Sequence, residues 1–118
     1  MHPFEVQDSA FDGRHTLFLS GELDIVATGA LSDVLLEISR TGATSMTLDL
    51  GGLTFIDSTG MSAVLFAREL SERQGWDFSL IPGSPRIQHV FEVTGLVDAL
   101  PFRRGPFDEG CGTELSAY

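Results

Sequence analysis

The feature that most constrains this chain is an apolar strand that passes directly into an amphipathic helix, within residues 48–60. The strand end carries a carboxylate and two hydroxyls, in the order Asp57, Ser58 and Thr59, before Gly60. Apolar residues then follow at three- and four-residue spacing, at Met61, Val64, Leu65, Ala67 and Leu70. This spacing predicts a helix that begins at Ser58, in a fold where helices alternate with strands.

Short strands and helices alternate along the rest of the chain. Strands are predicted over residues 4–8, 15–20, 46–50 and 78–81, with a last short edge strand at residues 100 and 102. Helices are predicted over residues 27–38, 58–74 and 84–94. The pair Asp12-Gly13 favours a hairpin between the first two strands, which should be antiparallel. The sequence therefore predicts a small α/β domain of order β-β-α-β-α-β-α(-β), with four to five mixed strands and helices packed against them.

Length and charge limit the function classes. A chain of 118 residues is most economically one domain. Seven basic and seventeen acidic residues give a net charge of −10, which argues against nucleic acid or an anionic membrane as partner and suits a basic protein. A single cysteine, Cys111, fits a reducing compartment. With no signal peptide and no apolar span, a cytoplasmic protein is expected.

Most catalytic chemistries lack the residues that they need. His2, His15 and His89 are isolated, and Cys111 has no second cysteine at ligand spacing, so neither a metal nor another cofactor is expected. No nucleophile elbow or phosphate-binding glycine loop is present in the sequence. The most serious catalytic alternative is an aspartyl-phosphate enzyme that uses Asp57. The chain contains no lysine, which such chemistry normally requires, and this weakens that alternative.

Ser58 has two physical interpretations at this stage. At a helix N-terminus, unpaired N–H groups and the positive dipole end favour a phosphate attached to the Ser58 hydroxyl. Equally, Asp57 or Ser58 could simply cap the helix, as residues of these types do in many proteins. The local residues leave both interpretations open.

Two motifs resemble the STAS domain of bacterial anti-sigma factor antagonists. They are Gly21-Glu22-Leu23-Asp24, after the second strand, and the segment Phe55–Met61 at the exit of the third strand. The resemblance extends over about residues 4–102, with Leu48-Asp49-Leu50 before the second motif and Thr94-Gly95-Leu96 after the last helix. It implies a STAS domain over residues 1–102, followed by a tail over 103–118 that we expect to be flexible.

The resemblance also implies a regulatory binding protein rather than an enzyme. In the family, the unmodified protein binds an anti-sigma factor that is also a serine kinase and so releases the sigma factor, and phosphorylation reverses this. By this resemblance, the phosphate would be attached to Ser58, with Thr59 as a possible secondary acceptor. A serine phosphatase would remove it. Partner-binding residues would be Asp24, Asp57, Ser58, Thr59, Gly60 and Met61.

Within that implied fold, Asp57 is expected to orient Ser58 or support docking, and Gly60 to allow a close backbone approach. Asp24 is expected to lie on the adjacent loop and to face the partner. The main alternative is a STAS adaptor that docks constitutively on a signalling or lipid-transport assembly, with Ser58 only a helix cap. A monomer is the default expectation.

Overall fold

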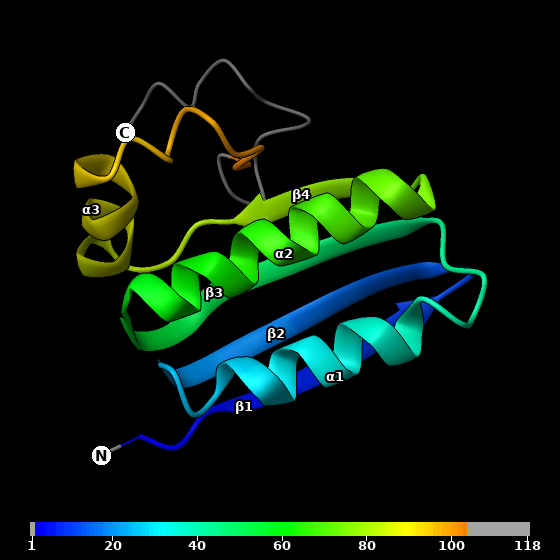
Figure 1. Ribbon diagram of the computed structural model, residues 1–118, viewed down its shortest axis with the longest axis horizontal. Helices are drawn as coiled ribbons and strands as arrows, with labels where there is room; N and C mark the ends of the chain where they lie inside the picture. Colours follow the sequence, from blue (N-terminus) through cyan, green and yellow to red (C-terminus); the bar gives the residue numbers. More distant parts are fainter. Residues whose placement is uncertain (1, 104–118) are drawn as a thin grey trace.

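The computed structural model describes residues 2–103, which form a mixed four-stranded sheet and three helices (Figure 1). The strands lie side by side in chain order: β1 (Glu5–Phe11), β2 (Arg14–Leu23), β3 (Ser45–Ile56) and β4 (Asp77–Ile81). The helices are α1 (Thr28–Ile38), α2 (Ser58–Gln74) and α3 (Pro85–Val93). The predicted element order and α/β class are confirmed.

Strand directions follow the predicted connections. β1 and β2 are antiparallel, and the two residues between them, Asp12 and Gly13, have φ angles of 55° and 80°. These left-handed conformations suit a tight hairpin, which explains the Asp-Gly pair. β2, β3 and β4 are parallel, because α1 and α2 carry the chain back between them. The expected last edge strand is reduced to one parallel bridge between Leu80 and Phe102.

β3 is longer than the sequence predicts. The sequence predicts an end at Leu50, but the strand continues through Gly51 and Gly52 to Ile56. A Cβ at Gly52 would lie 2.9 Å from the carbonyl oxygen of Leu19, so this glycine permits close approach to β2. The pairing of β2 with β3 shifts register in the same region, which is typical of a β-bulge.

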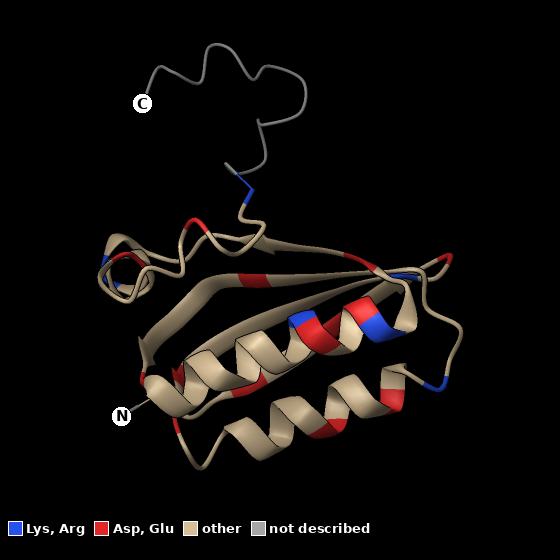
Figure 2. Cartoon of the chain, turned by 45° about the horizontal axis from the view of Figure 1, so that its top comes forward, with Lys and Arg blue, Asp and Glu red and all other residues tan. Residues whose placement is uncertain are grey.

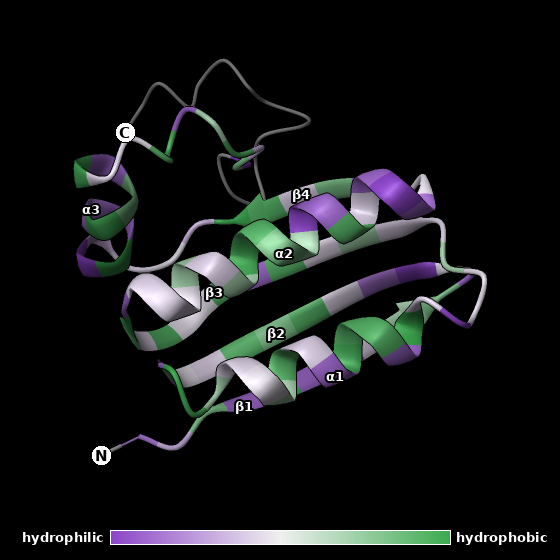
Figure 3. Ribbon diagram, in the orientation of Figure 1, coloured by the Kyte–Doolittle hydropathy of each residue, from purple (hydrophilic) through white to green (hydrophobic). Residues whose placement is uncertain are grey.

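α1 and α2 lie side by side over one face of the sheet (Figure 1). Alternate residues of the central strands point toward them and form the core with the inner faces of the two helices. Hydrophobic bands recur along β2, β3, α1 and α2 (Figure 3). Fully buried strand residues of this face include Leu17, Leu19, Met46, Leu48, Leu50 and Leu80. The other face carries mainly polar side chains from all four strands, and we call it the open face; its residues include Gln7, Ser9, Arg14, Thr16, Phe18, Ser45, Thr47, Asp49, Asp77 and Ser79.

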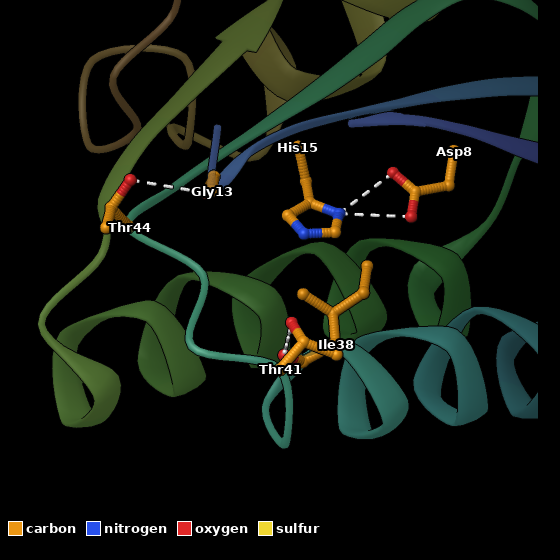
Figure 4. Close-up of polar contacts among 6 residues, drawn as sticks. All are labelled: Asp8, Gly13, His15, Ile38, Thr41 and Thr44. Carbon is orange, nitrogen blue, oxygen red and sulfur yellow. Dashed lines mark hydrogen bonds and ion pairs between the residues drawn. The ribbon is translucent and has the colours of Figure 1, made fainter. Parts of the chain in front are cut away.

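The hairpin end of the sheet is held together by polar contacts (Figure 4). Nδ1 of His15 lies 3.0 Å from both carboxylate oxygens of Asp8, across the antiparallel pair. The Thr44 hydroxyl and N–H both donate to the carbonyl of Gly13, at 3.2 and 2.7 Å. The His15–Asp8 contact joins β1 to β2, and the Thr44 bonds tie this hairpin to the segment that leads into β3.

The chain after α3 packs back against the sheet edge. The rings of Phe91 and Phe102 form an edge-to-face pair with centroids 5.2 Å apart. Arg103, the first residue of the expected tail, donates to the hydroxyls of Ser79 and Thr47. The rest of that tail, residues 104–118, lies outside the described residues. Among residues 2–103, no helix is both long enough and apolar enough to cross a membrane.

Candidate functional site

The start of α2 is capped by Asp57, which lies just after the end of β3. Asp57 has an extended backbone (φ −117°, ψ −170°), as an N-cap residue requires. Its carboxylate accepts a hydrogen bond from the Gly60 N–H at 2.9 Å and another from the Thr59 hydroxyl at 2.6 Å. These bonds, the Thr59 hydroxyl first, lower the pKa of Asp57 below its ordinary value of 3.8, because they stabilise the ionised form. The cap is therefore Asp57 and not Ser58.

Ser58 is the first residue of α2, and it is exposed. The Asp57 hydrogen bonds go to Thr59 and Gly60, so Asp57 does not orient Ser58 through a direct side-chain bond. Charged residues of α2 are confined to its C-terminal half (Figure 2). The helix start thus offers a hydroxyl, free N–H groups and the positive end of the dipole, without a charged side chain of its own helix nearby.

Asp24 organises the loop between β2 and α1. Its carboxylate accepts hydrogen bonds from the N–H groups of Val26 at 3.1 Å and Ala27 at 3.0 Å, and its carbonyl accepts from Thr28. The loop presents two apolar side chains to solvent: Ile25 is 69% exposed and Val26 is 84% exposed. A loop held by its own hydrogen bonds and exposing apolar surface is suited to contact a partner.

Gly60 brings the two segments together. A Cβ at Gly60 would lie 2.3 Å from the carbonyl oxygen of Leu23, the residue immediately before Asp24. The predicted close backbone approach at Gly60 is therefore present, and the neighbour is the end of β2. Because β2 and β3 are parallel, their carboxyl ends meet at one edge of the sheet, with Leu23 opposite Ile56. The Asp24 loop and the start of α2 consequently form one continuous surface.

Met61 does not belong to that surface. It was expected to contact a partner, but its side chain is only 5% exposed and packs in the core. The reason is helical geometry, since position 61 begins the apolar stripe that faces the sheet. Gly60 is likewise buried and acts through its backbone packing.

Three exposed apolar residues at this edge were missed. Ile25 and Val26 lie on the Asp24 loop, and Phe55 lies at the end of β3, opposite Glu22 of β2. Consecutive β-branched residues between an aspartate and a helix were the available signal for Ile25 and Val26. Phe55 follows the strand alternation, and only the sheet shows which face it occupies.

The titratable residues of this edge do not form a metal centre. No group of three or more His, Cys, Asp or Glu side chains that could hold a metal ion occurs within residues 2–103. The one carboxylate at the start of α2, Asp57, is engaged with its own helix terminus. Beside this cap, Ser58 places an exposed hydroxyl at the same edge of the sheet.

The mixed sheet, the helices on one face and the exposed edge define a small α/β binding domain. The STAS domain family model matches residues 5–106, and the chain belongs to the STAS domain family. The fold class inferred from the sequence motifs is thereby confirmed.

Relatives and solved structures agree with this assignment. The chain is 24% identical over 100 residues to an anti-sigma-B factor antagonist of Staphylococcus aureus, covering 85% of this chain and 93% of that protein. An anti-sigma factor antagonist from Mycobacterium paratuberculosis superposes with a TM-score of 0.76 at 21% identity, covering 98% and 93% of the two chains. The phosphorylated form of the Bacillus cell fate determinant SpoIIAA gives 0.65 at 23% identity, covering 85% and 90%. The first two of these proteins are named anti-sigma factor antagonists, which are regulatory binding proteins and not enzymes.

Proposed function

We propose that this domain is an anti-sigma factor antagonist that docks through the Asp24 loop and the start of α2, and that phosphorylation of Ser58 switches docking off. The observation that carries the proposal is the exposed Ser58 hydroxyl beside the self-capped Asp24 loop, on a surface fixed by Gly60. Relatives named anti-sigma factor antagonists support the role. The partner is then an anti-sigma factor with serine kinase activity, and a serine phosphatase restores the active form.

Electrostatics supply the switch. A phosphate adds about −1.5 to −2 charges at pH 7. The surface already carries Asp24, Asp57 and Glu22, so the added charge raises both repulsion and desolvation cost against a partner that fits the unmodified form. Meanwhile the N-terminus of α2 stabilises the phosphate locally. Docking is therefore lost without unfolding, and the domain behaves as a surface switch.

The geometry bears on which hydroxyl accepts the phosphate. Thr59 is half-buried, and its hydroxyl is committed to the Asp57 carboxylate at 2.6 Å. A kinase would have to break that charge-assisted bond to reach Thr59, whereas Ser58 is exposed. Ser58 is thus the primary acceptor in our proposal.

The constitutive adaptor is the second candidate function. It keeps the same docking surface and differs in having no modification at Ser58. Its original support was that Ser58 could be a helix cap, but the cap is Asp57. The exposed apolar pair Ile25 and Val26 fits either function, since both need a partner surface.

A binding experiment separates the two functions. Wild type, Ser58→Ala and Ser58→Asp proteins are used as baits in lysate of the native host, and bound proteins are identified by mass. The matched control is Ser84→Asp, which adds the same charge at the N-terminus of α3, where Ser84 is the exposed N-cap. A phospho-switch predicts that an ATP-binding kinase is retained by Ser58→Ala and Ser84→Asp and lost by Ser58→Asp. Equal recovery of another assembly by all baits would favour the adaptor.

A further inference from the structure

The open face of the sheet carries charges of opposite sign at its two ends. Because side chains alternate along a strand, residues of neighbouring strands line up there in transverse rows about 6.7 Å apart. Each row takes one residue from β2, β3 and β4 in turn. The row at the hairpin end is Arg14, Ser45 and Asp77; the next is Thr16, Thr47 and Ser79; the third is Phe18, Asp49 and Ile81. β1 adds Phe11 beside Arg14, Ser9 beside Thr16, Gln7 beside Phe18 and Glu5 beside Ser20.

The hairpin half of the open face holds two arginines in one hollow. Nε of Arg103 donates to the Ser79 hydroxyl at 3.0 Å, and its Nη2 donates to the Thr47 hydroxyl at 3.3 Å. Arg14 lines the same hollow. No carboxylate within residues 2–103 lies at ion-pair distance from either arginine. Asp77 also lines the hollow, two strands away from Arg14, and reduces the positive potential without neutralising both cations.

The other half of the open face is acidic. A second hollow is lined by Glu5, Gln7, Phe18 and Asp49, together with Gly51 and Gly52. Phe18 is 44% exposed and lies near the middle of the face. An apolar centre with a basic half on one side and an acidic half on the other is self-complementary under a two-fold rotation.

We propose that two copies of this chain associate through their open faces. The two-fold axis lies between the two faces and runs across the strands, between the Thr16 and Phe18 rows. This rotation places each strand over its own copy in the reverse direction. Arg103 of one copy then lies over Asp49 of the other, and Arg14 lies over the region of Glu5. Each pair occurs twice, and the two Phe18 rings pack around the axis.

The size of the face sets the strength of the dimer. Four strands at about 4.8 Å spacing and a length of about 23 Å for the seven residues of β1 give a face of roughly 450 Å² for each copy. The dimer would bury roughly 900 Å² in total, below the standard size of about 1,600 Å². The association is therefore weak, dependent on concentration and sensitive to salt.

This dimer leaves the docking surface free. The rotation reverses the strand direction, so the two edges that carry Ser58 lie at opposite ends of the pair. The inference does not rest on the proposed function, because it uses none of the residues of the Asp24 loop or of the start of α2.

The test is a dilution series of the full chain, from about 1 mM to about 10 µM, followed by sedimentation and by amide NMR spectra at low salt. The expected result is a mass that rises toward two copies, with concentration-dependent shifts at the Thr16, Phe18 and Asp49 amides. About 500 mM NaCl should weaken the association several-fold. A monomer mass throughout, or shifts confined to α1 and α2, would overturn the proposal. The proposal would also be overturned if residues 104–118 of the same copy were found to cover the open face at every concentration.

Charge exchange tests the orientation. Arg14→Glu and Glu5→Arg, each alone, should weaken dimerisation about tenfold, and the double variant should recover most of the loss. Arg103→Glu should weaken it similarly. Arg86→Glu, an exposed arginine in the first turn of α3, makes the same change in net charge away from the face and should have no effect. Equal weakening by Arg86→Glu and Arg103→Glu would refute the proposed interface, as would a double variant no better than the single ones.

Discussion

Gly60 of α2 lies against the carbonyl oxygen of Leu23 at the end of β2, with no room for a side chain between them. This contact joins two segments that are 37 residues apart in the sequence (residues 23 and 60). The contact holds the Asp24 loop and the start of α2 next to each other at one edge of the sheet. A partner that binds both segments at once therefore depends on the contact between Gly60 and Leu23.

Gly60→Ala is expected to destabilise the fold by about 1–3 kcal/mol, because the new Cβ would lie 2.3 Å from backbone that must shift. Urea unfolding measures the loss. The control is Gly29→Ala in the first turn of α1, where nothing lies within 4 Å of an added Cβ. That change should stabilise the protein by roughly 0.5–1 kcal/mol through helix propensity. If both variants unfold at the wild-type urea concentration, the Leu23 contact has no energetic importance.

Asp57→Asn is expected to lower stability at pH 7 and to matter less in acid. The folded-state pKa of Asp57 lies below its ordinary value of 3.8, so the unfolded chain takes up the proton first as the pH falls. The stability from ionised Asp57 is therefore complete well above 3.8 and is lost as the pH falls through the folded pKa.

Urea unfolding at pH 7 and at successively lower pH measures this difference between wild type and Asp57→Asn, which should shrink toward zero. Asp33→Asn, at an exposed carboxyl on α1, is the control and should give no comparable difference at pH 7. A gap between wild type and Asp57→Asn that stays constant as the pH falls far below 3.8 would contradict the assigned role of the carboxylate.

Gly21→Ala is expected to release the N-terminal segment. Gly21 has φ of +85°, and a Cβ there would lie 2.1 Å from the carbonyl oxygen of Pro3. Gly42→Ala has the same backbone strain, at φ +79°, but nothing within 4 Å. Each substitution should cost about 1–2 kcal/mol for the left-handed backbone, and Gly21→Ala should cost more.

Hydrogen exchange separates strain from displacement in these two variants. The Glu22 N–H donates to the carbonyl of His2 at 3.0 Å, so it should exchange faster in Gly21→Ala and at the wild-type rate in Gly42→Ala. Unchanged protection of Glu22 in both proteins would show that the N-terminal segment is not held by this contact.

Thr59→Val is expected to retain phosphorylation at Ser58 while losing about 1–2 kcal/mol of stability, because Asp57 loses its hydroxyl donor. Thr59→Ser keeps a donor and should recover most of that stability. Phosphopeptide mapping after treatment with the partner kinase, alongside unfolding, gives both quantities. Modification that persists in Ser58→Ala and disappears in Thr59→Val would make Thr59 the acceptor and reverse our assignment.

Local patterns in the sequence were sufficient for most of the elements. Apolar residues at helical spacing predicted α2 from Ser58 to Gln74, and both ends agree with the structure. The Asp12-Gly13 pair predicted the hairpin, since few residue pairs adopt two successive positive φ angles without strain. These features depend on neighbours a few residues apart, which the sequence displays directly.

The sequence by itself also determined the family and the position of Ser58 at a helix start, because both depend on short motifs. Only the tertiary structure decided that β3 runs through its glycine pair and that Met61 is buried, since these depend on backbone that approaches from β2 and the sheet. The same is true of the Gly60–Leu23 contact and the divided charge of the open face. Such features arise when parallel strands bring distant segments into register, and register is a long-range property that local residue patterns do not encode.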